Sequence, residues 1–330
     1  MVGRNPDLVL QSRIPNYKIG DINEALYERR ELFDVWDKNM SICCMQDWPC
    51  FSHYRARYID WCKQYPHEME DIRRYLMDND SACSSDIKMD HKVDWHYGPQ
   101  RFAKAALESM CYAGLAIVHH KNNTRRYYGL AERYIPKELF AAKEPFATME
   151  EYYEWAVLRR INSVGLLWNK ASDAWLGIRG LKTSERNTAF TSLLQKNKTK
   201  RVHIEGIDIP FYIDAQNTDL LKKSADSKPP DTMRILAPLD NMLWDRKLIK
   251  ALFGFDYKWE VYTPVKERKF GYYVLPLTLG NEFVGRIEFE KKQNIVRVKH
   301  VWYEESTNVD DALGISLDLC IQRFIRYLAP

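Results

Sequence analysis

The sequence contains three groups of cationic and amide side chains that could bind the backbone of a nucleic acid. Lys and Arg neutralise phosphate charge and release counterions, and short amides can hydrogen-bond to groove edges. The first group occupies a predicted hairpin tip and comprises Lys121, Asn122, Asn123, Arg125 and Arg126. Turns also favour Asn and Lys, so a solvated tip is the alternative. The winged-helix pattern described below favours phosphate contact.

The other two groups leave the choice open. Arg101 and Lys104 lie near the start of a predicted helix, where a recognition helix would meet DNA. Lys198, Lys200 and Arg201 form a denser basic run before a second predicted hairpin. That run could follow phosphates, or its cations could complement the dipole at a helix end. Contact with DNA and a solvated charged face are equally consistent with both groups.

Residues that could carry metal or nucleophilic chemistry do not form a recognisable site. His119 and His120 are neighbours on a predicted strand, so their side chains should point to opposite faces. The seven cysteines include no two C-x-x-C pairs at zinc spacing, which favours free thiols in a reducing cytosol. No Gly-rich phosphate loop is present. We expect no metal, no cofactor and no nucleotide hydrolysis.

Composition places the chain among ordinary globular proteins. With 330 residues, 45% of them hydrophobic, it can form two or three domains with their own cores. No apolar run is long enough to span a bilayer, and the polar segment Gly3–Asp7 does not resemble a signal peptide. The formal net charge of +4 neither requires nor excludes a nucleic-acid partner. We expect a soluble cytoplasmic protein.

Residues 66–140 have the pattern of a winged helix. Helical periodicity runs from Pro66 to Met77, Ser84–Asp86 is a polar start for a second helix, and Gly98-Pro99 opens a third. Gly114 stands where a left-handed C-terminal cap belongs. Two predicted strands, 115–120 and 125–128, then flank a polar turn.

Residues 146–221 repeat this order. Thr148-x-x-Glu151 is a capping box for a helix that ends near Gly165. Shorter helices begin at Ser172 and at Thr183 or Ser184. Strands over 201–205 and 207–212 then form a longer wing. The order predicts a second winged helix.

The remaining segments frame these two units. Residues 1–65 contain an apolar, aromatic run at 31–36, and residues 222–230 form a predicted exposed linker with two prolines. Residues 231–330 are predicted to form an antiparallel sheet of strands 257–262, 272–279, 283–289 and 295–302, with a final helix over 310–328. The predicted fold class is α+β, with tandem winged helix-turn-helix units followed by a small antiparallel β domain with a C-terminal helix.

A long pattern in the C-terminal part carries a family resemblance. Asp240, Trp244, Asp245 and Arg246 fall in a D-x-x-x-W-D-R-K segment. A Tyr-Thr-Pro element, a G-Y-x-V-L-P-L element and a V-G-R element that ends at Arg286 follow it. This pattern, rich in Trp, Pro and Gly, resembles the signature of the bacterial YcaQ-type crosslink-repair DNA glycosylases, which are relatives of the AlkZ glycosylases.

The sequence departs from that family pattern at two places. Glu288 stands where the family has Asp after V-G-R, and Lys38-Asn39 stand where many members have His-Glu. These positions indicate either a subfamily with different lesion contacts or a function that has drifted.

The resemblance implies winged helices, with residues 1–65 as the remnant of a first one, and it implies a reaction. That reaction is hydrolysis of the N-glycosidic bond of N7-alkylated purines, including interstrand crosslinks, by a Gln-x-Asp motif that holds a water. The motif has no counterpart in this sequence, which resembles the family from a point just after it. We therefore expect a monomer that binds double-stranded DNA without releasing a base, and we assign no catalytic residue. A non-catalytic winged-helix DNA-binding protein, regulatory or degenerate, is the alternative.

Overall fold

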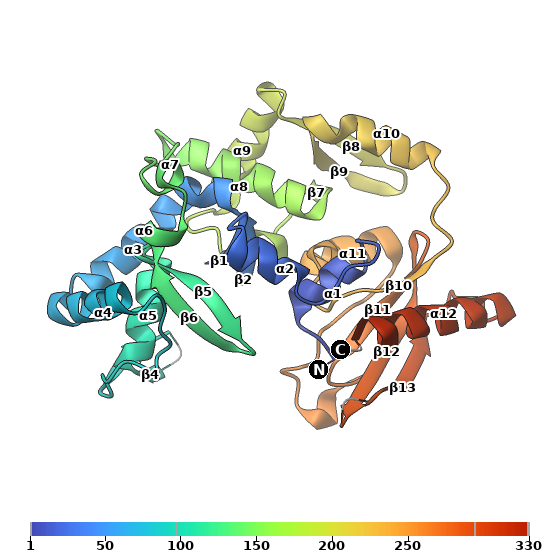
Figure 1. Ribbon diagram of the computed structural model, residues 1–330. Helices are drawn as coiled ribbons and strands as arrows, with labels where there is room; N and C mark the ends of the chain where they lie inside the picture. Colours follow the sequence, from blue (N-terminus) through green and yellow to red (C-terminus); the bar gives the residue numbers. More distant parts are fainter. Residues whose placement is uncertain (1, 97, 294, 329–330) are drawn as a thin grey trace. The chain divides into compact units, whose positions relative to one another are not determined.

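A computed structural model describes residues 2–96, 98–293 and 295–328 of the chain (Figure 1). Its contacts divide the chain into two compact units. Unit 1 comprises Met1–Ile22, Tyr153–Leu176 and Leu181–Pro330, and unit 2 comprises Asn23–Tyr152 and Gly177–Gly180. Both units combine helices with antiparallel sheets, which confirms the predicted α+β class. Among the helices of the described residues, none has both the length and the apolar composition of a membrane span.

Unit 2 begins with a hairpin and two helices. Its first elements are a π-helix, two paired strands, a 3-10 helix and two α-helices: η1 (Glu24–Glu28), β1 (Leu32–Trp36), β2 (Met40–Cys44), η2 (Met45–Phe51), α3 (Ser52–Cys62) and α4 (Pro66–Asp78). α4 begins at Pro66 as predicted, because a proline in the first turn has no helical hydrogen bond to lose. α3 was not predicted, because only Tyr58 and Cys62 are buried on it and its apolar periodicity is weak.

The core of unit 2 is built around the helix α5 (Phe102–Tyr112). Its residues Phe102, Ala106 and Leu107 are fully buried and share one hydrophobic cluster with Ile72 and Leu76 of α4. Gly114 follows α5 with a φ of 76°, which confirms the left-handed cap.

The segment before α5 differs from the prediction. Ser84–Asp86 is a turn rather than a helix, because the Asp86 carboxylate accepts the backbone N–H of Cys83 and the neighbouring Ala82 bridges to Tyr128. Gly98-Pro99 belongs to the strand β4 (Gly98–Arg101), which pairs only with β3 (Lys92–Trp95) in a two-stranded sheet. An edge strand tolerates a proline, because the missing N–H need not join a ladder on both sides.

The predicted hairpin after α5 is present. Its strands β5 (Ala116–Asn122) and β6 (Arg125–Leu130) pair in antiparallel register, and the short helices α6 (Ala131–Tyr134) and α7 (Lys137–Phe140) follow. Helix α8 (Met149–Val164) begins in unit 2 and continues into unit 1. The Thr148 hydroxyl accepts the backbone N–H of Glu151, whose carboxylate accepts the N–H of Ala147, so the predicted helix start is confirmed.

The first sheet of unit 1 has the strand order β7-β9-β8. Its elements are β7 (Leu167–Trp168), η3 (Asp173–Trp175), α9 (Thr183–Gln195), β8 (Thr199–Ile204), β9 (Ile207–Asp214) and η4 (Ala215–Asn217). These bounds confirm the predicted starts at Ser172 and Thr183, and Gly206 takes a φ of 79° in the turn between β8 and β9. Part of the predicted linker is helical, since α10 spans Thr218–Asp226.

The second sheet of unit 1 has four antiparallel strands. Their order is β10 (Met233–Ile235), β11 (Val274–Leu279), β12 (Glu282–Lys292) and β13 (Ile295–Tyr303). The helix α12 (Asp311–Leu328) supplies Leu317 and Phe324 to the same hydrophobic cluster. The helix α1 (Asn5–Gln11) also contributes Leu8 to this cluster, so residues 2–11 pack with the C-terminal sheet (Figure 1).

One further detail of the C-terminal part differs from the prediction. Residues 257–262 do not form a strand; they are irregular chain that ends in a turn, with Tyr257 and Glu260 buried. The short helices α2 (Asp21–Asn23), η5 (Asn241–Trp244), α11 (Arg246–Phe253) and η6 (Val265–Glu267) complete the element order.

Candidate nucleic-acid interface

The tip of the β5–β6 hairpin presents amides and one arginine to solvent. Asn122, Asn123 and Arg125 are exposed, and Asn123 has a φ of 54°, a left-handed conformation that Asn tolerates. The Asn123 amide donates to the Asn122 side chain over 3.3 Å. These three residues stand where a hairpin can contact phosphates or groove edges.

The other two cations of this hairpin face inward. The Lys121 ammonium lies 2.5 Å from a carboxylate oxygen of the buried Asp34, which also accepts the hydroxyl of Tyr27 over 2.9 Å. The Arg126 side chain is only 26% exposed and lies 3.9 Å from the Glu108 carboxylate. Their charges are therefore compensated within unit 2, and Arg125 is the exposed cation of the predicted group.

The predicted cations at the start of α5 divide in the same way. Arg101 donates to the backbone oxygen of Ile87 over 2.5 Å and forms an ion pair of 2.8 Å with Asp90. Lys104 is exposed and donates to the side-chain oxygen of Gln100 in β4, over 3.2 Å. Arg101 thus fixes the segment that precedes α5, while the Lys104 ammonium stays at the surface.

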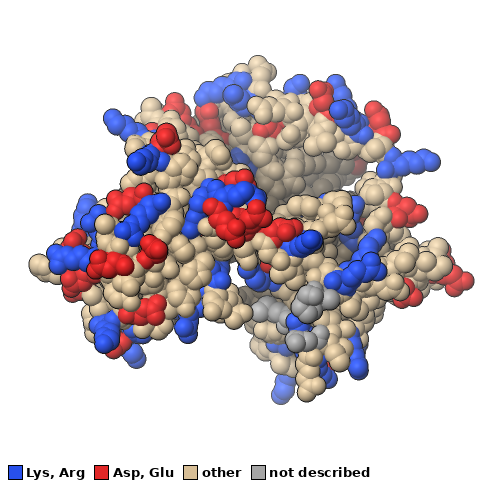
Figure 2. Space-filling view, in the orientation of Figure 1, with Lys and Arg blue, Asp and Glu red and all other residues tan. Residues whose placement is uncertain are grey.

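The β8–β9 hairpin of unit 1 carries the densest exposed cations of the predicted groups. Lys198, Lys200 and Arg201 are all exposed, and none forms an ion pair with a described residue. The nearby Lys196 differs, because its ammonium lies 2.7 Å from the Glu154 carboxylate. β8 is the edge strand of its sheet, so its outer side is open to a ligand. On the face shown in Figure 2, Lys and Arg are interspersed with Asp and Glu. The attraction of a phosphate backbone therefore depends on local groups of cations rather than on the net charge of the chain.

Two of the family-signature residues, Asp240 and Asp245, lie in the interior of unit 1. Asp240 is fully buried, and its carboxylate accepts a hydrogen bond from each of the two terminal guanidinium nitrogens of Arg13, both over 2.6 Å. Asp245 is also fully buried; it accepts the indole N–H of Trp168 over 2.7 Å and caps α11 through the backbone N–H of Leu248. These two carboxylates join segments that are more than seventy residues apart in the chain.

The other signature residues are placed differently. The Arg160 guanidinium, which is fully buried, lies 5.3 Å from the ring centroid of Trp244. Arg246 is exposed at the start of α11. Arg286 is buried, pairs with Glu304 over 2.8 Å and lies over the ring of Phe270 at 4.2 Å.

The two adjacent histidines do not point to opposite faces. A β-bulge between Val118 and His120 breaks the alternation of β5, so the Nδ1 atoms of His119 and His120 lie 2.8 Å apart. Burial and the nearby Arg30 guanidinium lower the pKa of both imidazoles. Within the described ranges, no cluster of three or more His, Cys, Asp or Glu side chains could hold a metal ion.

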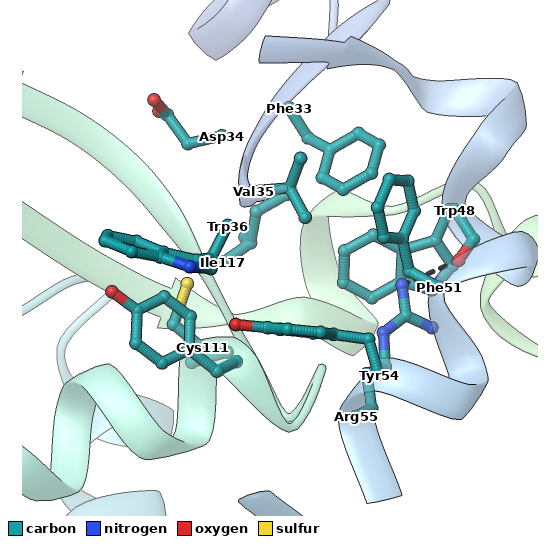
Figure 3. Close-up of a pocket in the computed structure, with 12 residues that line it drawn as sticks. Phe33, Asp34, Val35, Trp36, Trp48, Phe51, Tyr54, Arg55, Cys111 and Ile117 are labelled. Carbon is teal, nitrogen blue, oxygen red and sulfur yellow. Dashed lines mark hydrogen bonds between the residues drawn. The ribbon is translucent and has the colours of Figure 1, made fainter. Parts of the chain in front are cut away.

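A small aromatic cavity in unit 2 was not predicted (Figure 3). Trp36, Trp48 and Tyr54 line it, and the Arg55 guanidinium lies 3.7 Å from the Trp48 ring centroid and donates to the Trp48 backbone oxygen over 2.7 Å. Burial raises the pKa of the Cys111 thiol to about 12, so the thiol is protonated and not nucleophilic. The cavity of about 20 Å³ has room for one water, not a base.

Exposed cations on antiparallel hairpins beside short helices are typical of proteins that bind a nucleic-acid backbone. The family described as "DNA glycosylase AlkZ-like" matches residues 2–324, so the chain belongs to the AlkZ-like DNA glycosylases. Its fold is similar to the solved structure of the Streptomyces sahachiroi DNA glycosylase AlkZ, with a TM-score of 0.59 and 11% sequence identity. The similarity covers 98% of this chain and 86% of the AlkZ chain. The expected family is therefore confirmed, and DNA is its implied partner.

Proposed function

We propose that this chain binds double-stranded DNA through the β8–β9 hairpin, assisted by the tip of the β5–β6 hairpin. The observation that carries the proposal is the exposure of Lys198, Lys200 and Arg201 without an internal ion pair. Three such cations can replace condensed counterions on phosphates, which gives affinity with little sequence preference. The segments 66–140 and 146–221 would then act as winged helices, and the protein would act as a monomer in the bacterial cytoplasm, associated with the nucleoid.

We propose that the reaction associated with this site in the family is hydrolysis of the N-glycosidic bond of an N7-alkylated purine. The purine is either a single alkylated base or part of an interstrand crosslink. An N7-alkylated purine is cationic and is already a good leaving group, so a positioned water and charge stabilisation at the sugar suffice. The Gln-x-Asp motif that would hold this water is absent from the 330-residue sequence. We therefore propose that this polypeptide binds damaged DNA but does not release the base.

A second candidate is a DNA-binding protein without any catalytic role. The burial of carboxylates in structural contacts favours it. Asp240, Asp245 and Glu288 each accept hydrogen bonds from groups that hold the fold, so none is free to activate a water.

The test of DNA binding is charge reversal on the β8–β9 hairpin. A variant with Lys198→Glu, Lys200→Glu and Arg201→Glu should lose affinity for any short duplex in fluorescence anisotropy. The slope of log K against log salt should become less steep by up to about 2.7, since each lost phosphate contact removes about 0.9 from its magnitude.

The matched control reverses three exposed lysines elsewhere in unit 1, namely Lys222→Glu, Lys223→Glu and Lys228→Glu. It makes the same change in net charge, so it should weaken binding only through the general field. Equal losses in the two variants would show that the hairpin is not the contact surface.

Activity is tested on DNA that contains N7-methylguanine or a nitrogen-mustard crosslink. We expect the chain to bind both substrates and to release no base in a single-turnover assay. Base release that persists through repeated purification would contradict the proposed inactivity and would rule out the binding-only candidate.

A further inference from the structure

The loop over residues 258–272 of unit 1, called here the tip loop, exposes large apolar side chains. Tyr262 is 89% exposed, Val265 is 75% exposed and Tyr272 is 44% exposed. They lie close together in sequence around Pro264 and the single turn of η6. Surface apolar side chains that gather in this way mark a site of interaction rather than scattered surface residues.

Two buried carboxylates hold the tip loop in place. Glu260 accepts the backbone N–H groups of Lys269 and Phe270, each over 2.9 Å, and of Gly271 over 3.3 Å. Glu288 accepts the N–H of Tyr272 over 3.0 Å. Both ends of the loop are therefore fixed, and its exposed side chains project from a rigid base.

A close approach and a contact across the loop add to this rigidity. A Cβ atom at Gly271 would lie 2.7 Å from the Glu288 carboxylate, so any larger residue there would displace the carboxylate that holds the loop. The Arg268 guanidinium donates to the Thr263 backbone oxygen over 2.9 Å and so joins the two sides of the tip. A preorganised loop loses little conformational entropy when it binds.

The tip loop also carries four cations. Lys258, Lys266 and Lys269 are exposed, and the Arg268 guanidinium lies 5.0 Å from the ring centroid of Tyr272. Glu267 is the exposed acid among them. A rigid loop that carries exposed apolar side chains and exposed cations fits a ligand with an anionic backbone and flat apolar faces, which is the chemistry of a nucleic acid.

We propose that Tyr262, supported by Val265, inserts between stacked base pairs of the DNA that this chain binds. The cations of the tip loop would neutralise the adjacent phosphates while the phenol ring stacks on a base. Apolar wedges of this kind unstack a base step and bend the duplex. The inference rests on the proposed DNA binding and adds a local distortion of the duplex to it.

The experiment uses a short duplex in which several adenines are replaced by 2-aminopurine, whose fluorescence rises when it is unstacked. Anisotropy of the same duplex gives the affinity. The unaltered chain should bind and raise the 2-aminopurine signal. Tyr262→Ala should lose this rise and weaken affinity by about 5- to 150-fold, the range for removing one stacking aromatic side chain. Tyr262→Trp should retain both readouts.

The matched control is Ile315→Ala on α12, which removes an apolar side chain that is 62% exposed in the same unit. It should change neither readout. Because Tyr262 is almost fully exposed, its replacement should leave the far-UV circular dichroism spectrum unchanged.

The outcomes separate the two proposals. Failure of the unaltered chain to bind duplex at low salt overturns the proposed function and the wedge with it. Binding without a 2-aminopurine signal, or an undiminished signal in Tyr262→Ala, overturns the wedge alone. Tyr262-dependent sedimentation with vesicles of anionic phospholipid, without Tyr262-dependent duplex distortion, would assign the tip loop to a membrane surface instead.

Discussion

Replacement of Asp245 by alanine should destabilise unit 1 by removing two different interactions at once. The fully buried carboxylate accepts the Trp168 indole N–H over 2.7 Å and caps α11 through the N–H of Leu248 over 3.0 Å. Loss of a helix N-cap costs about 1 kcal/mol. A buried donor left without a partner costs about 1–3 kcal/mol more. The expected decrease in the free energy of unfolding is roughly 2–4 kcal/mol.

The same unit offers a control that loses only a cap. Asp310 caps α12 through the N–H of Leu313 over 2.9 Å, and it is exposed. Asp310→Ala should therefore cost only about 1 kcal/mol. Urea unfolding followed by far-UV circular dichroism measures both variants.

A double-mutant cycle isolates the indole bond. In the background of Trp168→Phe, where the buried donor is gone, Asp245→Ala should cost only the cap, about 1 kcal/mol. If Asp245→Ala costs no more than Asp310→Ala, or if its cost is unchanged in the Trp168→Phe background, the signature carboxylate does not stabilise unit 1 through Trp168 and the reasoning fails.

Three further outcomes can be measured on single variants. Arg13→Ala should lower the free energy of unfolding by about 1–3 kcal/mol in urea, because it leaves the fully buried Asp240 without its cation; the cost is below that of a fully buried pair, since the Arg13 side chain is 42% exposed. Arg126→Ala should lower the melting temperature of unit 2, whereas Arg125→Ala should leave it unchanged, because only Arg126 is packed inside; equal effects would contradict the inward placement. Burial by itself raises the pKa of Glu288, but the hydrogen bond from Lys299 and the N–H groups of Tyr273 and Tyr272 lower it overall. A carboxyl group whose pKa is lowered in the folded state stabilises the fold at pH values above its unfolded pKa of about 4.3. This stabilisation decreases below that pH and is lost as the pH falls through the folded-state pKa. Amide hydrogen exchange at Tyr272 should therefore accelerate below that pH, after correction for intrinsic exchange, and Glu288→Gln should remove this pH dependence.

Local patterns were sufficient for the elements that local interactions control. The starts of α4 and α9, the cap at Gly114 and the turn at Glu205-Gly206 depend on residues within a few positions of each other. A proline, a capping side chain or a glycine acts there through backbone geometry alone. The C-terminal signature, likewise, identified the family without any knowledge of contacts.

Tertiary contacts decided the direction in which each candidate side chain points. The sequence contained Lys121, Arg125 and Arg126 as equal members of one basic tip, but Asp34 and Glu108 draw two of them inward from distant segments. The bulge in β5 turned two histidines toward each other, although strand alternation predicts opposite faces. Neither partner choice nor a bulge follows from residues adjacent in sequence.

The sequence by itself determined the family, the α+β class and the residue types available for phosphate contact. Only the tertiary structure decided that Asp240 and Asp245 bind Arg13 and Trp168, that residues 2–11 pack with the C-terminal sheet, and that Tyr262 stands in solvent. The physical reason is that a side chain's charge and shape are local properties. Its burial and its hydrogen-bond partner depend on which distant segment packs against it.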